Sequence, residues 1–388
     1  MKVLYISTAD YKYGAAKTQI DMIERLQSKF GIEPVILTKK HNPLNELCDQ
    51  KGIENYSYWY RDIMAGSAYS NPILNMAKHI VKYVMYIRGM LTQKGIMNCG
   101  INFDTIDIIH SNHIRIDIGA YISRKTKCPH IWHIKELNKG HIKIVHYKNK
   151  CYQYINNNAD AFIAVTKQVK DYWCEAGISP HKVEVIYEGI DVSKFIPKKQ
   201  RKDDLLKIVC VGRIEKGKGQ MQILDAVSKL PEHIKEKVRV DFIGESYPDY
   251  LHQMKNFMKN SNLSNQINFL GYCGDIPEKL SNYDVGILSS RGDAFGTVTA
   301  EYMAAGLVAI ATYTELVEHG NTGFRYDFDD TDKLAENIIY VYENRQKAEE
   351  IAIRGKEEIS KNYSIERNAN EVYSLYEKVL KNGRKGIS

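Results

Sequence analysis

Two rounds of alternation between short apolar runs and helical patterns constrain the fold of this 388-residue chain more than any other feature. In the first round, six apolar runs are predicted as strands, at Val3–Ser7, Pro34–Thr38, Ile106–His110, His130–His133, Ala161–Val165 and Val183–Tyr187. Helical spacing lies between them, for example at Ala15–Lys29 and Asp117–Lys125. Strands that alternate with helices predict a parallel sheet with helices on both faces.

A charged segment, DVSKFIPKKQRKDDLLK at 191–207, interrupts this pattern and has the composition of a linker. The alternation then resumes, with predicted strands at Ile208–Gly212, Val238–Ile243, Ile267–Leu270, Val285–Ser289 and Val308–Thr312. Predicted helices lie near 218–230, 248–260, 296–305, 331–344 and 346–361, and a last helical pattern covers Ile365–Leu380. We therefore predict an α/β protein of two doubly wound, Rossmann-like domains that face a deep inter-domain cleft, with ligands at the carboxyl ends of the strands.

Composition narrows the class of protein further. Apolar residues make up 44% and charged residues 26%, which is ordinary for a globular chain. The start, MKVLYISTAD, is too short for a signal-peptide core, and no apolar run of about 18 residues occurs, so we expect a cytoplasmic protein that does not span a membrane. The seven cysteines include no C-x-x-C pair, and the histidines lack metal-ligand spacing. We therefore expect neither a disulfide framework nor a metal site.

The positive charge is concentrated in the first half. Residues 1–200 hold 28 Lys and Arg against 18 Asp and Glu, a net charge of +10, whereas the remainder holds 26 against 29, or −3. This asymmetry indicates either an anionic partner or a solvated lysine face. Within it, residues 56–94 are both aromatic and basic. That segment is either a patch for a membrane surface or lipid acceptor, or a helix whose aromatic residues belong to the core.

Residues 284–323 carry the clearest chemistry. Asp293 and Glu301 lie on either side of a predicted loop-to-helix junction, and the helix opens at Phe295-Gly296. A helix N-terminus favours phosphate because it presents unpaired N–H groups and a partial positive charge. A carboxylate inside such a helix accepts hydrogen bonds from sugar hydroxyls. The junction is therefore suited to hold a phosphate and a sugar together.

A second polar loop follows the first strand of the second half. In GRIEKGKGQ (212–220), Arg213 and Lys218 lie five residues apart around a glycine-bearing turn. Arginine donates in a fork and lysine acts as a point charge, so the pair suits a pyrophosphate; the alternative is a basic turn in solvent. The loop matches neither G-x-G-x-x-G nor the P-loop motif.

Two further residues end or follow strands in the first half. Gly14, followed by two alanines, permits close approach of the backbone to a ligand before a helix, although a simple tight turn explains it equally. His133 ends the strand in PHIWHIKEL and is placed to donate to a sugar hydroxyl or phosphate; the alternative is a satisfied structural histidine.

These pieces occur in an order that resembles the retaining GT-B glycosyltransferases of glycosyltransferase family 4. VIYEGIDVSKF (185–195) is similar to the family's inter-domain signature, VGRIEKGKG (211–219) to its donor-phosphate loop, and DAFGTVTAEYMAAGLVAIAT (293–312) to its E-x7-E segment, with HGNTG (319–323) at the end of that region. The resemblance covers nearly the whole chain. It implies an acceptor-binding domain at 1–192, a donor-binding domain at 193–364, and a C-terminal helix at 365–388 that packs back on the first domain.

The resemblance assigns four residues to the reaction itself. Arg213 and Lys218 would bind the donor diphosphate and stabilise the charge that develops on it. Asp293 replaces the family's first glutamate, which faces the transferred sugar, with a side chain one methylene shorter. His133 would lie near the sugar and the acceptor. Glu188 stands where the family usually has asparagine.

A second set would bind the nucleotide sugar: Gly14, Gly212, Tyr272, Phe295, Gly296, Thr297 and Glu301. Within it, Glu301 would hold the ribose hydroxyls, and Gly296 and Thr297 would offer backbone N–H groups to the phosphate. Tyr272 lies where the base-contacting loop of the family falls, and Gly14 matches a glycine loop near the diphosphate.

The implied reaction moves a sugar from a UDP- or GDP-linked donor to a hydroxyl of a glycan or lipid-linked glycan, with retention, without a metal ion or further cofactor, and with no nucleic-acid partner. The HIKEL segment (133–137) resembles capsule and exopolysaccharide transferases, which favours work at the inner face of the cell membrane. Two alternatives remain. A dinucleotide-dependent oxidoreductase is disfavoured because Gly14 lacks its G-x-G partners, and a non-catalytic nucleotide-sugar-binding protein is favoured only by Asp293 and Glu188.

Overall fold

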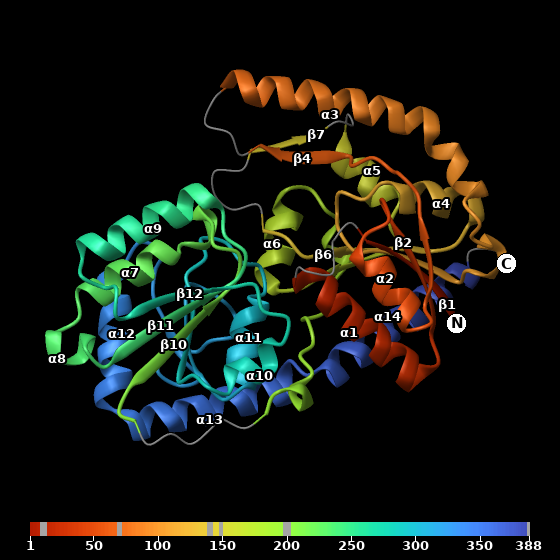
Figure 1. The fold of residues 1–388 in the computed structure, drawn as a ribbon. Coiled ribbons are helices and arrows are strands. Elements are labelled where there is room, and N and C mark those ends of the chain that lie inside the picture. Colours follow the sequence, from red (N-terminus) through yellow and green to blue (C-terminus); the bar gives the residue numbers. More distant parts are fainter. Residues whose placement is uncertain (8–13, 68–71, 138–142, 147–149, 197–202, 386–388) are drawn as a thin grey trace. The chain divides into compact units, whose positions relative to one another are not determined.

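The computed structural model describes the chain except for residues 8–13, 68–71, 138–142, 147–149, 197–202 and 386–388. The chain forms two compact units, which can be followed by colour along the ribbon in Figure 1. Unit 1 comprises Met1–Gly189 and the C-terminal segment from Ile365, and unit 2 comprises Ile190–Ser364. Each unit has its own parallel sheet and its own apolar core.

Unit 1 contains a seven-stranded sheet of order β3-β2-β1-β5-β6-β8-β9, and all neighbouring strands in it are parallel. Its strands are β1 (Lys2–Ser7), β2 (Glu33–Thr38), β3 (Glu54–Ser57), β5 (Ile108–Ser111), β6 (His130–Ile134), β8 (Ala161–Ala164) and β9 (Val183–Val185). A separate antiparallel pair joins β4 (Met64–Ser67) to β7 (Lys143–His146).

Both faces of this sheet are buried, because successive side chains of a strand point to opposite faces. Val3 and Tyr5 of β1 join a cluster with α1 (Gly14–Phe30), α2 (Pro43–Gln50) and α14 (Ile365–Lys385), whereas Leu4 and Ile6 join another with η1 (Gln93–Asn98), η2 (Phe103–Thr105) and α4 (Ile118–Thr126). The remaining helices of unit 1 are α3 (Pro72–Thr92), α5 (Cys151–Asn157), α6 (Lys167–Glu175) and η3 (Pro180–Lys182). The rings of Phe30 in α1 and Tyr373 in α14 stack at 4.0 Å, so the C-terminal helix is part of unit 1.

Unit 2 contains a six-stranded parallel sheet of order β12-β11-β10-β13-β14-β15. Its strands are β10 (Leu206–Val211), β11 (Val238–Ile243), β12 (Ile267–Gly271), β13 (Val285–Leu288), β14 (Val308–Ala311) and β15 (Phe324–Arg325). Its helices are η4 (Val192–Lys194), η5 (Lys216–Lys218), α7 (Gln220–Ser228), α8 (Glu232–Lys235), α9 (Pro248–Asn260), α10 (Ile276–Leu280), α11 (Thr297–Ala304), α12 (Thr331–Glu343) and α13 (Arg345–Asn362).

The prediction of two doubly wound α/β domains is confirmed. Every predicted strand is present, and its ends lie within two residues of the predicted ends. The prediction misses β3, the β4–β7 pair and β15, which are short or carry polar residues and so lack a long apolar run.

The aromatic and basic segment 56–94 has a mixed outcome. Tyr60 and Tyr86 are buried, as expected for core residues, but Tyr83 is 51% exposed, and Tyr69 lies outside the described residues. Over the part of the chain that the structure describes, no helix is long and apolar enough to cross a membrane.

Candidate active site

The loop after β10 is held by glycines at both ends. Gly212 has φ +148° and Gly219, which precedes α7, has φ +66°, a region that L side chains rarely adopt. A Cβ on Gly219 would lie 2.1 Å from the carbonyl oxygen of Ser289, so no larger residue fits. The Ser289 hydroxyl also donates to the Lys218 carbonyl oxygen at 2.8 Å. The loop is therefore fixed against the end of the neighbouring strand β13.

This packing brings two predicted site residues together. Lys218 Nζ lies 3.0 Å and 3.1 Å from the two carboxylate oxygens of Asp293, across 75 positions of sequence. Their side chains are 33% and 27% exposed. Arg213, on the same loop, lies 3.3 Å from Glu215. Both cations are thus partly open to solvent and paired with an acid that an incoming diphosphate can replace.

The helix predicted after β13 is present as α11 and begins at Thr297, one residue after the predicted start. Gly296 has φ +80° and precedes α11, and its carbonyl oxygen accepts hydrogen bonds from the N–H groups of Thr299 at 2.8 Å and Ala300 at 3.1 Å. Because β13 pairs directly with β10, the N-terminus of α11 and the Lys218 loop lie at the same edge of the sheet. Phe295 is buried and packs 6.0 Å from the ring of Tyr363, so its side chain is a structural anchor.

Glu301 is half-buried in α11, and the residue after it fixes the helix. The Tyr302 hydroxyl accepts a hydrogen bond from the Val211 N–H at 2.7 Å, and a Cβ on Gly286 would lie 2.1 Å from the Tyr302 ring. Burial raises the pKa of Tyr302 well above its usual value, so the phenol stays neutral. Tyr302 therefore ties α11 to β10 and β13. The sequence interpretation missed this role, although a tyrosine in the small-residue helix YMAAG was a visible signal.

Tyr272 stands apart from these residues. It follows β12 at the same sheet edge and is 56% exposed, but β11 separates β12 from β10. Gly14 opens α1 of unit 1, and the loop before it lies outside the described residues.

His133 is buried in unit 1 within a chain of hydrogen bonds. Its Nδ1 lies 3.2 Å from Nε2 of His110, whose Nδ1 lies 2.6 Å from the hydroxyl of Tyr376. Burial lowers the pKa of His133 well below its usual value and that of His110 to about 3, so both rings are neutral at pH 7.

The direction of this chain sets what His133 can do. Tyr376 donates to the Tyr5 hydroxyl, so it accepts from His110 Nδ1–H, and His110 Nε2 then accepts from His133 Nδ1–H. This leaves His133 Nε2 as an acceptor, and that atom is buried with no hydrogen-bond partner among the described residues. In this tautomer, His133 Nε2 is suited to accept a hydrogen bond from a hydroxyl rather than to donate one, and its predicted contact with a sugar or phosphate stays a prediction.

Glu188, at the position where family 4 usually has asparagine, forms a buried ion pair. Its Oε1 lies 3.0 Å from Lys135 Nζ and accepts from the Thr18 hydroxyl at 3.2 Å. Both charged side chains are less than a tenth exposed. The extra negative charge at this sheet edge is therefore balanced within unit 1.

Outside the gaps in the described chain, no group of three or more His, Cys, Asp or Glu side chains is arranged to hold a metal ion. None of the seven cysteines, all of which lie in described positions, forms a disulfide.

Two family models match consecutive parts of the chain. Residues 14–194 match "Glycosyltransferase Family 4" and residues 191–358 match "Glycosyl transferases group 1". Among curated proteins, the N-acetyl-alpha-D-glucosaminyl L-malate synthase of Bacillus anthracis is 22% identical over 302 residues, covering 73% of this chain and 77% of its own. The lipopolysaccharide core biosynthesis mannosyltransferase LpsB of Rhizobium meliloti is 27% identical over 220 residues, covering 51% of this chain and 61% of its own.

A solved structure matches the whole fold. HepE of Anabaena, crystallised with UDP, with UDP and glucose, and with UDP-glucose, is 20% identical in its UDP complex and covers 97% of this chain and 100% of its own, with a TM-score of 0.78. At this identity the likeness concerns the fold.

Proposed function

Because this chain belongs to the GT-B glycosyltransferases of family 4 type, we propose that it transfers a hexose from a UDP- or GDP-linked sugar to a hydroxyl of a glycan or lipid-linked glycan, with retention and without a metal ion. One observation carries the proposal. Lys218 and Asp293 meet at the edge of the unit 2 sheet where two adjacent strands present a basic loop and a helix N-terminus. Cations and helix-end N–H groups at one edge are what a diphosphate needs.

In the proposed reaction, the acceptor oxygen bonds to the anomeric carbon as the bond from that carbon to the diphosphate oxygen breaks. Negative charge develops on the departing diphosphate, which also takes the acceptor proton. Arg213, Lys218 and the N-terminus of α11 stabilise that charge, and one such preorganised donor is worth about 3–4 kcal/mol. The diphosphate replaces Asp293 as the partner of Lys218, which leaves the Asp293 carboxylate to accept from the transferred sugar.

The other assigned residues bind the two ends of the substrates. Glu301 accepts from the ribose hydroxyls, the backbones of Gly212, Gly296 and Thr297 contact the diphosphate, and the exposed ring of Tyr272 stacks on the base. In unit 1, His133 Nε2 accepts from a sugar or acceptor hydroxyl, which satisfies an otherwise unpaired buried atom. Gly14 permits close approach of the backbone to the diphosphate.

The comparisons suggest which donor and acceptor to test first. HepE was crystallised with UDP-glucose, so UDP-hexoses are the first donors to test. One relative is named as a lipopolysaccharide core biosynthesis mannosyltransferase, which supports a polysaccharide or lipid-linked glycan acceptor. The location at the inner face of the cell membrane is proposed from the likeness of the HIKEL segment (133–137) to capsule and exopolysaccharide transferases.

A donor panel tests the proposal directly. The protein is incubated with UDP- and GDP-hexoses, acceptor mixtures and EDTA, and release of nucleoside diphosphate is measured. Arg213→Ala and Lys218→Ala are each expected to lower turnover at least about a hundredfold. Lys216→Ala, an exposed lysine of the same loop, is the matched control and should leave turnover nearly unchanged.

The outcomes separate the alternatives. Near-normal turnover in either variant contradicts the phosphate role. No release with any donor, together with tight nucleotide binding, favours a non-catalytic nucleotide-sugar-binding protein. Loss of activity in EDTA that Mg²⁺ or Mn²⁺ restores contradicts metal independence, and product with inverted anomeric configuration by NMR contradicts retention.

A further inference from the structure

Helix α3 carries its apolar residues on the outside. It runs along the outer side of unit 1 in Figure 1, and large apolar side chains along its whole length are exposed. Among them, Val84 is 60% exposed and Leu91 is 77% exposed. The exposed apolar residues of the helix are Ile73, Leu74, Met76, Ile80, Val81, Tyr83, Val84, Met85, Ile87, Met90 and Leu91. At 3.6 residues per turn they cover more than half of the helix circumference.

The side of α3 that faces unit 1 is the polar one. Tyr86 and Gly89 are buried, and Lys78 and Lys82 are half-buried on the same side of the helix. An ordinary surface helix points its apolar stripe at the core and its charged residues at water. In α3 this arrangement is inverted, so burial in unit 1 does not explain its apolar residues.

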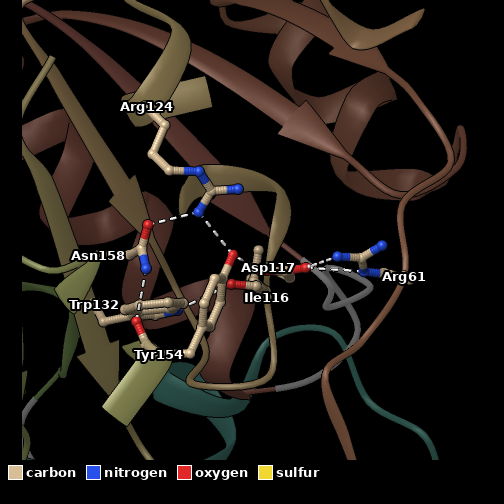
Figure 2. Close-up of polar contacts among 7 residues, drawn as sticks. All are labelled: Arg61, Ile116, Asp117, Arg124, Trp132, Tyr154 and Asn158. Atoms are coloured by element: carbon tan, nitrogen blue, oxygen red, sulfur yellow. Dashed lines mark hydrogen bonds and ion pairs between the residues drawn. The ribbon is translucent and has the colours of Figure 1, made fainter. Parts of the chain in front are cut away.

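A buried polar network fixes α3 in this orientation. Arg61 donates to one oxygen of Asp117 at 2.8 Å and 2.5 Å, and Tyr154 donates to the other at 2.5 Å, as Figure 2 shows. The guanidinium of Arg61 lies 4.5 Å from the Tyr86 ring centroid. A Cβ on Gly89 would lie 2.6 Å from the Arg61 side chain. The inner side of α3 therefore packs directly on the Arg61 side chain.

The charge of this region has one sign. Residues 63–103 contain no Asp or Glu but include Lys78, Lys82, Arg88 and Lys94. Burial and the nearby Lys78, Arg115 and Lys39 lower the pKa of Lys82, with Asp62 as the opposing charge. Lys78 and Lys82 lie on the inner side of α3 next to the apolar arc, whereas Arg88 is exposed within the arc, one turn from Val84 and Leu91.

We propose that α3 lies in the plane of an anionic lipid bilayer, with its apolar arc in the acyl-chain boundary and its basic residues at the headgroup phosphates. A broad apolar face with lysines beside it is the form of an interfacial helix, and the long side chain of Arg88 can carry its charge from within the face to the headgroups. A second copy of the chain is the less suitable occupant, because a symmetric contact would place two basic, acid-free segments against each other. The claim that catalysis takes place at this membrane rests on the proposed function, whereas bilayer binding does not.

Vesicle binding without any donor tests the proposal. The full-length protein is sedimented with vesicles of equimolar phosphatidylglycerol and phosphatidylcholine, and with phosphatidylcholine alone. We expect binding to the anionic vesicles that salt weakens in part. The Val84→Glu/Leu91→Glu double variant should reduce the partition coefficient at least about tenfold, since two apolar side chains no longer enter the boundary. Ile353→Glu, a 53% exposed position on α13, is the matched control and should bind like wild type.

A second variant guards against misfolding. Leu91→Trp keeps an apolar side chain, and its fluorescence should shift to shorter wavelength and be quenched by brominated lipids when anionic vesicles are added. No binding by the wild-type protein, or equal binding by the double variant, overturns the proposal. So does self-association of the wild type that the double variant abolishes without any vesicle binding. Diphosphate release in the donor panel is measured separately, so failure of bilayer binding and failure of sugar transfer can be told apart.

Discussion

Replacing Asp293 by Asn should tighten nucleoside diphosphate binding while it slows sugar transfer. Lys218 Nζ contacts both Asp293 carboxylate oxygens at 3.0 Å and 3.1 Å, and a donor diphosphate has to compete with them. The pair is about one-third exposed, so it contributes in the range of about 0.5–1 kcal/mol. Removing the charge of Asp293 therefore strengthens binding by about two- to fivefold. Turnover should fall at least about tenfold, because the sugar loses a charged acceptor.

Isothermal titration with UDP and GDP measures the first effect, and diphosphate release with the active donor measures the second. Asp332→Asn is the control, because it removes one carboxylate from the highly exposed start of α12 and leaves the Lys218 loop intact. It should change neither quantity. Unchanged or weaker binding by Asp293→Asn refutes the competition argument, even if turnover falls. Equal tightening in Asp332→Asn shows a general charge effect instead.

Three further changes test the surrounding structure. Tyr302→Phe leaves the Val211 N–H without its buried acceptor and should lower the free energy of unfolding by about 1–3 kcal/mol in urea titration; an unchanged midpoint contradicts the role of the hydroxyl. Glu188→Asn leaves Lys135 charged and buried and should cost about 3–5 kcal/mol, whereas adding Lys135→Met should recover most of it; a neutral single variant refutes the buried pair. Burial lowers the pKa of His110 from 6.5 to about 3, so the unfolded chain binds more protons than the folded chain between these values. The contribution of neutral His110 to the free energy of unfolding is therefore complete above pH 6.5 and falls by about 1.4 kcal/mol per pH unit below it. An unchanged urea midpoint between pH 6.5 and 4.5 contradicts this.

The strands were predictable because parallel strands buried on both faces are nearly continuous apolar runs. β13 and β14 are such runs, and a polar residue, Ser289 or Thr312, follows each of them at the carboxyl end. The loop before α7 and the start of α11 were predictable from their glycines. Gly219 and Gly296 both adopt positive φ, which favours glycine at these positions.

The pairings could not be predicted, because they join residues that only the sheet brings together. Lys218 meets Asp293 through the adjacency of β10 and β13, and His110 meets Tyr376 across 266 positions of sequence. The orientation of helix α3 could not be predicted for a different reason. Apolar residues cover most of its circumference, so their spacing does not tell which side faces the core. Its orientation depends on Arg61, which lies outside the helix.

The two departures from the family 4 pattern have one feature in common. Asp293 and Glu188 each lie within about 3.0 Å of a lysine, Lys218 in unit 2 and Lys135 in unit 1. A carboxylate left alone at either sheet edge would repel an anionic substrate, whereas a paired one adds no net charge. The Asp293 pair is partly exposed and open to exchange with a ligand, but the Glu188 pair is buried and costly to break. A lysine–carboxylate ion pair therefore permits substrate exchange in unit 2 and fixes local structure in unit 1. Because both carboxylates have such a role, neither departure from the family pattern indicates a loss of catalysis.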